Sequence, residues 1–151
     1  MTVKVFSIFG LFGLLAFSNA YAEPEAIPFF VQTIVATSHE QPHDDGKTKK
    51  IGPQLRKDLS PVFQWKHYRE VTCQKIELRQ GKVSRIQLTA ERELELQIKN
   101  EAQLELRLFR DRKLVRKITE SLSQRRVIMG GDRDNDEAWF VVVRRDKPST
   151  E

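Results

Sequence analysis

The chain has 151 residues, with 26 Lys and Arg against 21 Asp and Glu and a formal net charge of +5. This length leaves room for one hydrophobic core rather than two. Hydrophobic residues make up 39% of the chain and charged residues 31%, so the chain is too apolar to be wholly disordered. The small positive excess is spread along the sequence, which argues against a nucleic-acid-binding domain.

Residues 1–22 have the three parts of a secretory signal peptide. Lys4 is a positive start, residues 5–17 are an apolar run, and residues 20–22 (AYA) are a cleavage site. The run is shorter than the roughly 20 residues that a membrane-spanning helix needs. We therefore expect cleavage before Glu23, a periplasmic or secreted protein, no nucleic-acid partner and no stable membrane span after cleavage.

Residues 27–37 (IPFFVQTIVAT) are rich in β-branched and aromatic residues and carry no charge, which predicts a first strand. Residues 38–52 are polar and contain Pro42 and two glycines, which predicts a loop. Residues 23–52 are therefore expected to hold the first strand and a polar loop.

Residues 53–60 form the single predicted helix. Pro53 fits its first position, and Pro61 ends it. One face, which continues past the end of the helix, is apolar and is expected to pack on a sheet: Leu55, Leu59, Val62 and Phe63.

Beyond the helix, apolar and polar residues alternate as in strands. Val71 and Cys73 have one phase, and Ile76 and Leu78 have the other, which predicts a bulge between Cys73 and Ile76. On the face shared with Val71, Cys73 is expected to be a buried small apolar residue. The alternatives are an intermolecular disulfide and a reactive thiol. Residues 80–82 form a turn.

The clearest pattern is a hairpin over residues 94–108. Apolar residues at alternate positions point inward, and residues 100–102 form the turn. The register that follows places these pairs opposite one another: Ile98 and Leu104, Leu96 and Leu106, Leu94 and Leu108. It also places Glu95 opposite Arg107 on an outer, solvated face.

Three further strands follow the hairpin. Residues 114–122 form one, 127–129 form a short one that ends at Gly130-Gly131, and 138–143 (AWFVVV) form a central strand covered on both faces. Residues 132–137 between the last two form a charged loop. The regular spacing predicts an all-β fold with one short helix, either an antiparallel β-sandwich or a small open barrel. Residues 53–145 and the 27–37 strand form a single domain, and residues 146–151 form a polar tail.

The acidic loop is the candidate metal site. Asp132, Asp134 and Asp136 have the oxygen ligands and the alternate spacing of a Ca²⁺-binding loop. The glycine and glutamate that an EF-hand loop needs at its sixth and twelfth positions are absent, and a strand precedes the loop. A solvated hairpin loop is therefore the preferred interpretation.

Other candidate groups carry weaker signals. His39 and His43 have zinc-binding side chains, but Pro42 disfavours the helix on which their spacing would bring them together. Glu93 and Glu95 share an outer face and are interpreted as solvated rather than as an acid–base pair. Four aromatic residues are candidates for a small pocket, although aromatic residues on strands more often belong to a core: Trp65, Tyr68, Trp139 and Phe140.

The order of segments resembles small exported all-β bacterial proteins of uncharacterised function, over most of residues 27–145. The stretch VIMGG at 127–131 is also similar to the strand-Gly-Gly ending of secretin-type outer-membrane domains. That family usually has a Gly a few residues before the strand and an apolar residue after the Gly pair, whereas this chain has Arg125-Arg126 and Asp132. The resemblance implies a Gram-negative envelope setting and supplies no catalytic residues.

We expect a non-catalytic exported β-domain that binds or scaffolds another cell-envelope component, a protein partner, as in a secretion or surface-assembly apparatus. No cofactor is expected. The first alternative is a small-ligand or calcium-binding module that uses the loop 132–137. The second is a hydrolase whose site is assembled from distant residues.

Overall fold

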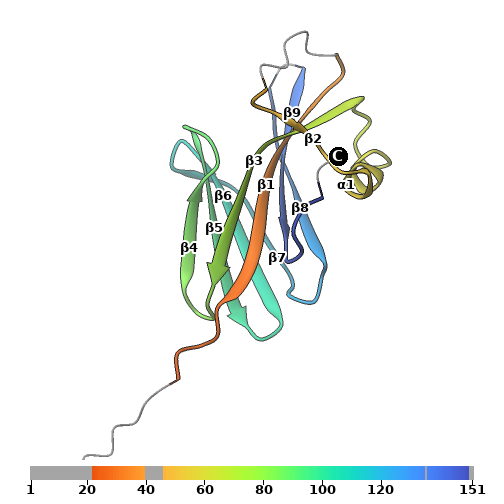
Figure 1. The fold of residues 1–151 in the computed structure, drawn as a ribbon. Coiled ribbons are helices and arrows are strands. Elements are labelled where there is room, and N and C mark those ends of the chain that lie inside the picture. The colour runs from red at the N-terminus through yellow and green to blue at the C-terminus, as the bar shows by residue number, and fades with distance from the viewer. Residues whose placement is uncertain (1–21, 40–45, 135, 150–151) are drawn as a thin grey trace, which may run out of the picture.

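The computed structural model describes residues 22–39, 46–134 and 136–149, so most of the expected signal peptide lies outside the described residues. Two antiparallel sheets pack face to face as a sandwich and do not close into a barrel (Figure 1). This confirms the all-β prediction and selects the sandwich. Within the described ranges, no helix has the length and apolar character needed to cross a membrane.

The larger sheet has five strands in the order β2-β3-β1-β9-β8. Their bounds are Ile27–Thr37 for β1, Lys49–Lys50 for β2, His67–Leu78 for β3, Arg126–Asp134 for β8 and Glu137–Arg144 for β9. The smaller sheet has four strands in chain order. These are β4 (Val83–Gln87), β5 (Arg92–Asn100), β6 (Gln103–Arg110) and β7 (Lys113–Ser121).

The main core fills the space between the two sheets. It consists of side chains from alternate strand positions: Phe29, Val31, Leu78, Leu88, Leu94, Leu96, Ile98, Leu104, Leu106, Leu108, Val127, Met129, Val141 and Val143. β1 and β9 lie at the centre of the larger sheet and are covered on both faces. The prediction of a central strand over residues 138–143 is therefore confirmed.

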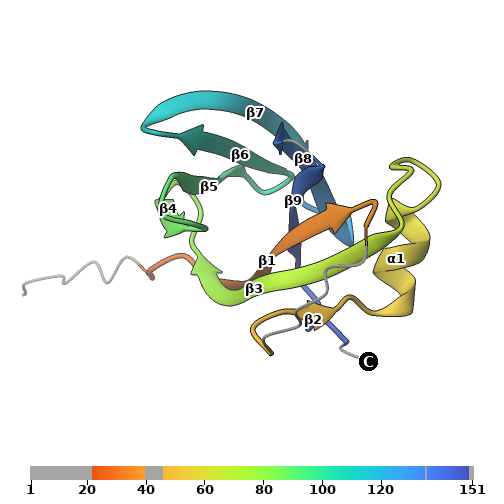
Figure 2. The same cartoon turned by 90° about the horizontal axis from the view of Figure 1, so that it is seen from above.

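The helix α1 (Pro53–Leu59) covers part of the other face of the larger sheet (Figure 2). Leu55 and Leu59 are buried in a second core, together with Ile34, Ala36, Ile51, Tyr68, Ala138, Phe140 and Val142. The helix ends before Pro61, as predicted. Val62 was expected to continue the apolar face, but it is 69% exposed because the helix has ended. Phe63 does pack on this core, 4.5 Å from the Phe140 ring.

The register of the predicted hairpin is confirmed, but the turn is shorter than the predicted 100–102, because β5 runs to Asn100, which pairs with Gln103 after a register shift. β5 and β6 pair Leu94 with Leu108, Leu96 with Leu106 and Ile98 with Leu104, and Glu95 lies opposite Arg107. The turn before β4 is also as predicted, and Gly81 adopts a φ of 77° there, in the left-handed region that glycine tolerates.

The outer face of the smaller sheet differs from the prediction. Glu95 and Glu105 are each only 6% exposed, because long cationic side chains from three strands lie over them. Arg85 approaches Glu95 at 2.6 Å and Arg107 approaches it at 3.4 Å, while Lys117 approaches Glu105 at 3.0 Å. Arg107 also pairs with Glu105. We call these five residues the charge ladder.

The predicted bulge and the predicted burial of Cys73 are wrong. The irregularity lies at Val71, since Thr33 pairs with Thr72 and the next pair joins Ile34 to Glu70. Beyond it, Ile76 and Leu78 face the main core, so Cys73 points to the opposite side and is exposed. The prediction assumed that side chains alternate regularly between the two faces over residues 71–73, but the bulge at Val71 interrupts this alternation.

The glycine pair does not end β8. The strand runs through Gly130-Gly131 to Asp134, which pairs with Glu137, and the register shifts between Gly130 and Arg133. β9 supplies pairing partners on both sides of this irregularity, so Gly130 is a paired residue of the strand, and Gly131 and Asp132 after it lie in a bulge instead of at a strand end. The predicted loop 132–137 is thus mostly strand. The predicted loop 38–52 likewise includes the short strand β2.

Candidate functional site

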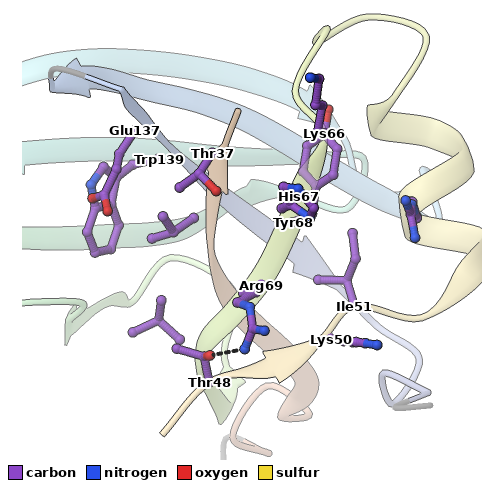
Figure 3. A pocket seen from close by; sticks show the side chains of 13 residues that line it. Thr37, Thr48, Lys50, Ile51, Lys66, His67, Tyr68, Arg69, Glu137 and Trp139 are labelled. Atoms are coloured by element: carbon purple, nitrogen blue, oxygen red, sulfur yellow. Dashed lines mark hydrogen bonds between the residues drawn. The ribbon is translucent and has the colours of Figure 1, made fainter. Parts of the chain in front are cut away.

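A pocket of about 390 Å³ lies at the end of the larger sheet where β2 pairs with β3 (Figure 3). This volume falls in the range of small-molecule sites. Its lining comes from β1, β2, β3, β9, α1 and the segments beside them: Val35, Thr37, Thr48, Lys50, Ile51, Arg56, Lys66, His67, Tyr68, Arg69, Val71, Glu137 and Trp139.

Strand pairing arranges part of this lining in two cross-strand rows. In the first row, Thr37 of β1 lies between Glu137 of β9 and His67 of β3. In the second, Val35 of β1 lies between Trp139 of β9 and Arg69 of β3, and Lys50 of β2 follows Arg69. Residues in such a row are neighbours on one sheet. The fold therefore brings together side chains that are far apart in the sequence.

Trp139 links this end of the larger sheet to the smaller sheet. The guanidinium carbon of Arg92, at the start of β5, lies 4.8 Å from the centroid of the Trp139 ring. Arg92 is only 8% exposed, so this cation–π contact is largely desolvated and holds the ring in place.

The charge of the pocket is predominantly positive. Its lining contains four Lys and Arg side chains, a histidine and one carboxylate, that of Glu137. Lys50 and Lys66 are exposed, and Arg69 donates a hydrogen bond from Nη1 to Thr48 Oγ1 at 2.9 Å. Cationic donors are the chemical groups that hold anions in proteins, and Val35, Val71 and Trp139 add apolar groups to the same lining.

Tyr68 has a structural role at the edge of the pocket. Its hydroxyl donates a hydrogen bond to the Phe63 carbonyl, and its ring lies 6.5 Å from that of Phe140. Burial is the main cause that raises the pKa of the Tyr68 hydroxyl above its usual value. The hydroxyl therefore stays protonated at neutral pH and fixes the segment after α1 against the sheet.

A second hollow, of about 610 Å³, lies on the outer face of the smaller sheet and includes Glu91, Glu93, Glu95 and Asp111. Glu95 belongs to the charge ladder, with Arg85 and Arg107 beside its carboxylate. A ligand for that carboxylate would have to displace ion pairs already formed. The basic pocket is therefore the better candidate for a binding site.

The candidate calcium ligands are only partly described. The backbone of Asp132 and Asp134 belongs to β8, Asp136 lies in the following turn and is exposed, and the side chains of residues 131–135 lie outside the described part. Among side chains that are described, no group of three or more His, Cys, Asp or Glu is placed to hold a metal ion. The calcium site stays a prediction. His43 also lies outside the described residues, while His39 is exposed.

The basic pocket is not among the sites predicted from the sequence. Residues 47–69 do carry a signal for it, because they contain seven Lys and Arg against one Asp. Of the four aromatic candidates, Tyr68 and Trp139 line the pocket, whereas Phe140 lies in the second core and Trp65 packs against it.

No protein-family model matches the chain, and no curated protein or solved structure has significant similarity to it.

Proposed function

We propose that the protein is a non-catalytic exported β-domain that binds another component of the cell envelope, and that an anionic group of that component enters the basic pocket. The observation that carries the proposal is that Lys50, Lys66 and Arg69 line the same pocket as Trp139, although they come from strands and a loop distant in sequence. Cationic donors beside an apolar wall suit a phosphate or carboxylate attached to a carbon skeleton.

The lining also favours binding over catalysis. Most of its charged side chains are Lys and Arg, the residue types that commonly bind phosphate and carboxylate groups in proteins. Among the described lining residues, Glu137 is the one with a carboxylate. Export and the envelope setting rest on the signal peptide predicted over residues 1–22.

A minimal aryl anion tests the pocket. The chain has two tryptophans, so Trp65→Phe leaves Trp139 as the only indole reporter. We expect phenyl phosphate to change Trp139 fluorescence saturably and phenol to have a much weaker effect. Replacing both pocket lysines, Lys50→Glu with Lys66→Glu, should lower the affinity at least tenfold.

The matched control is Lys99→Glu on β5, an exposed lysine of the other sheet, which should change the affinity less than twofold. No saturable change at millimolar phenyl phosphate, or equal losses in the pocket and control variants, would contradict the proposal. Cosedimentation with phosphatidylglycerol vesicles, compared with phosphatidylcholine vesicles, then separates a lipid headgroup from an anion carried by a protein.

A further inference from the structure

The strand β7 forms one edge of the smaller sheet, and no strand within the described ranges pairs with its outer side. Residues 113–117 are all exposed. Leu114 is 52% exposed and Val115 is 54% exposed, which places two large apolar side chains on this edge. A strand edge with unpaired backbone groups and exposed apolar side chains can accept a further strand.

The charge of this edge restricts what that further strand can be. Arg112, Lys113, Arg116 and Lys117 flank the apolar pair in the sequence, and of these Lys117 is already paired with Glu105. A second copy of β7, placed antiparallel and centred between Leu114 and Val115, would set Lys113 opposite Arg116 and Arg112 opposite Lys117. Like charges directly opposite one another destabilise a strand pair. Acidic side chains at those positions would instead be attracted.

The backbone shape of β7 adds to this restriction. Leu108 pairs with Arg116 and the next pair joins Phe109 to Leu114, so Val115 lies in a bulge. A bulge twists the edge and limits continuous pairing with a long, flat strand. The edge is thus suited to a short segment.

We propose that the outer edge of β7 binds a short, extended, acidic segment of another protein, which adds to the smaller sheet as a further strand. Backbone hydrogen bonds supply the pairing, Leu114 and Val115 supply apolar contact, and Arg112, Lys113 and Arg116 select acidic sequences. This surface is separate from the basic pocket and does not depend on it.

The test uses the isotope-labelled mature protein and a seven-residue peptide of alternating Glu and Val. We expect amide shift changes and slower hydrogen exchange centred on residues 113–117, with binding that weakens as salt is raised. The same peptide with Lys in place of Glu should not bind. Val115→Glu should lower the affinity at least tenfold.

The matched control is Val83→Glu on β4, the opposite edge of the same sheet, where Val83 is 46% exposed. It should change the affinity less than twofold, and Lys113→Glu should weaken binding without altering the melting temperature. Shift changes that centre on β4, or that disappear in the Lys50→Glu and Lys66→Glu variant, would overturn the proposal. Self-association of the free protein through β7 would also overturn the proposal. The absence of peptide binding would overturn it as well, and the cations would then serve only to prevent edge-to-edge association.

Discussion

Replacing Leu106 by Ala tests the packing of the sandwich most directly. Leu106 is completely buried between Leu96 of β5 and Ile118 of β7. The substitution removes three carbons, and at about 0.8 kcal/mol for each buried carbon the transfer contribution is about 2.4 kcal/mol. The cavity left between the sheets extends the expected loss of unfolding free energy to about 2–5 kcal/mol. A domain of this size is stable by only about 5–15 kcal/mol.

The control is the same substitution on the same sheet. Leu114 of β7 is 52% exposed, so Leu114→Ala should change the unfolding free energy by about 0.5 kcal/mol or less. Urea titration followed by circular dichroism measures both, and an unchanged slope with denaturant would show that the unfolded state is not altered. Equal losses in the two variants would refute the register of β6 and the position of the main core.

Three further predictions address titration, reactivity and metal binding. The hydrogen bond from Lys117, followed by the interactions with Arg107, holds the pKa of Glu105 below its usual value despite some desolvation. Glu105→Gln should therefore lower the free energy of unfolding at pH 7. The difference in unfolding free energy from wild type should shrink as the pH falls below the usual pKa range of glutamate, because these interactions stabilise only the ionised carboxylate. A difference that stays constant in denaturant melts at several pH values would contradict this prediction. Desolvation, followed by the Glu70 carboxylate, raises the pKa of the exposed Cys73 thiol. Iodoacetamide should therefore alkylate Cys73 more slowly than it alkylates the thiol of glutathione at pH 7.5, and Glu70→Gln should accelerate the reaction of Cys73. A faster reaction of Cys73 than of glutathione would contradict the raised pKa. If Asp132, Asp134 and Asp136 form only a solvated hairpin end, Ca²⁺ should not raise the melting temperature. Asp134→Ala should then change the free energy of unfolding by about 0.5 kcal/mol or less. A Ca²⁺-dependent rise in melting temperature that is lost in Asp134→Ala would instead establish the metal site.

The sequence predicts the local β structure well because period-two patterns are strong in this chain. In the hairpin, three inward apolar residues face three others across a short turn, and one register satisfies the pattern and the turn together. The helix is equally well predicted, since Pro53 and Pro61 lie at its two ends. These features depend on neighbours in sequence.

The features that the sequence does not reveal depend on contacts between distant strands. The sequence pattern predicts that Glu95 is a solvated residue on an outward face, but cationic side chains from β4 and β6 cover it. The sequence pattern predicts that Cys73 is buried, because the alternation of apolar and polar residues does not reveal the bulge at Val71. The basic pocket combines Lys50, Arg69 and Trp139, which become neighbours only when β2, β3, β1 and β9 align.

The charge ladder has a consequence for how β5 and β6 find their alignment. Sliding β6 by two residues would still place leucine against leucine, with Leu94 opposite Leu106 and Leu96 opposite Leu104, so the apolar pattern does not distinguish the two alignments. On the outer face, however, that slip would set Glu95 opposite Glu105, and Arg107, which lies opposite Glu95 in the native pairing, would move opposite Glu93. Like charges would then meet where opposite charges do now. Apolar side chains thus determine which face of the hairpin is inside, and the Glu95–Arg107 pair together with the turn favours the native alignment over this slip.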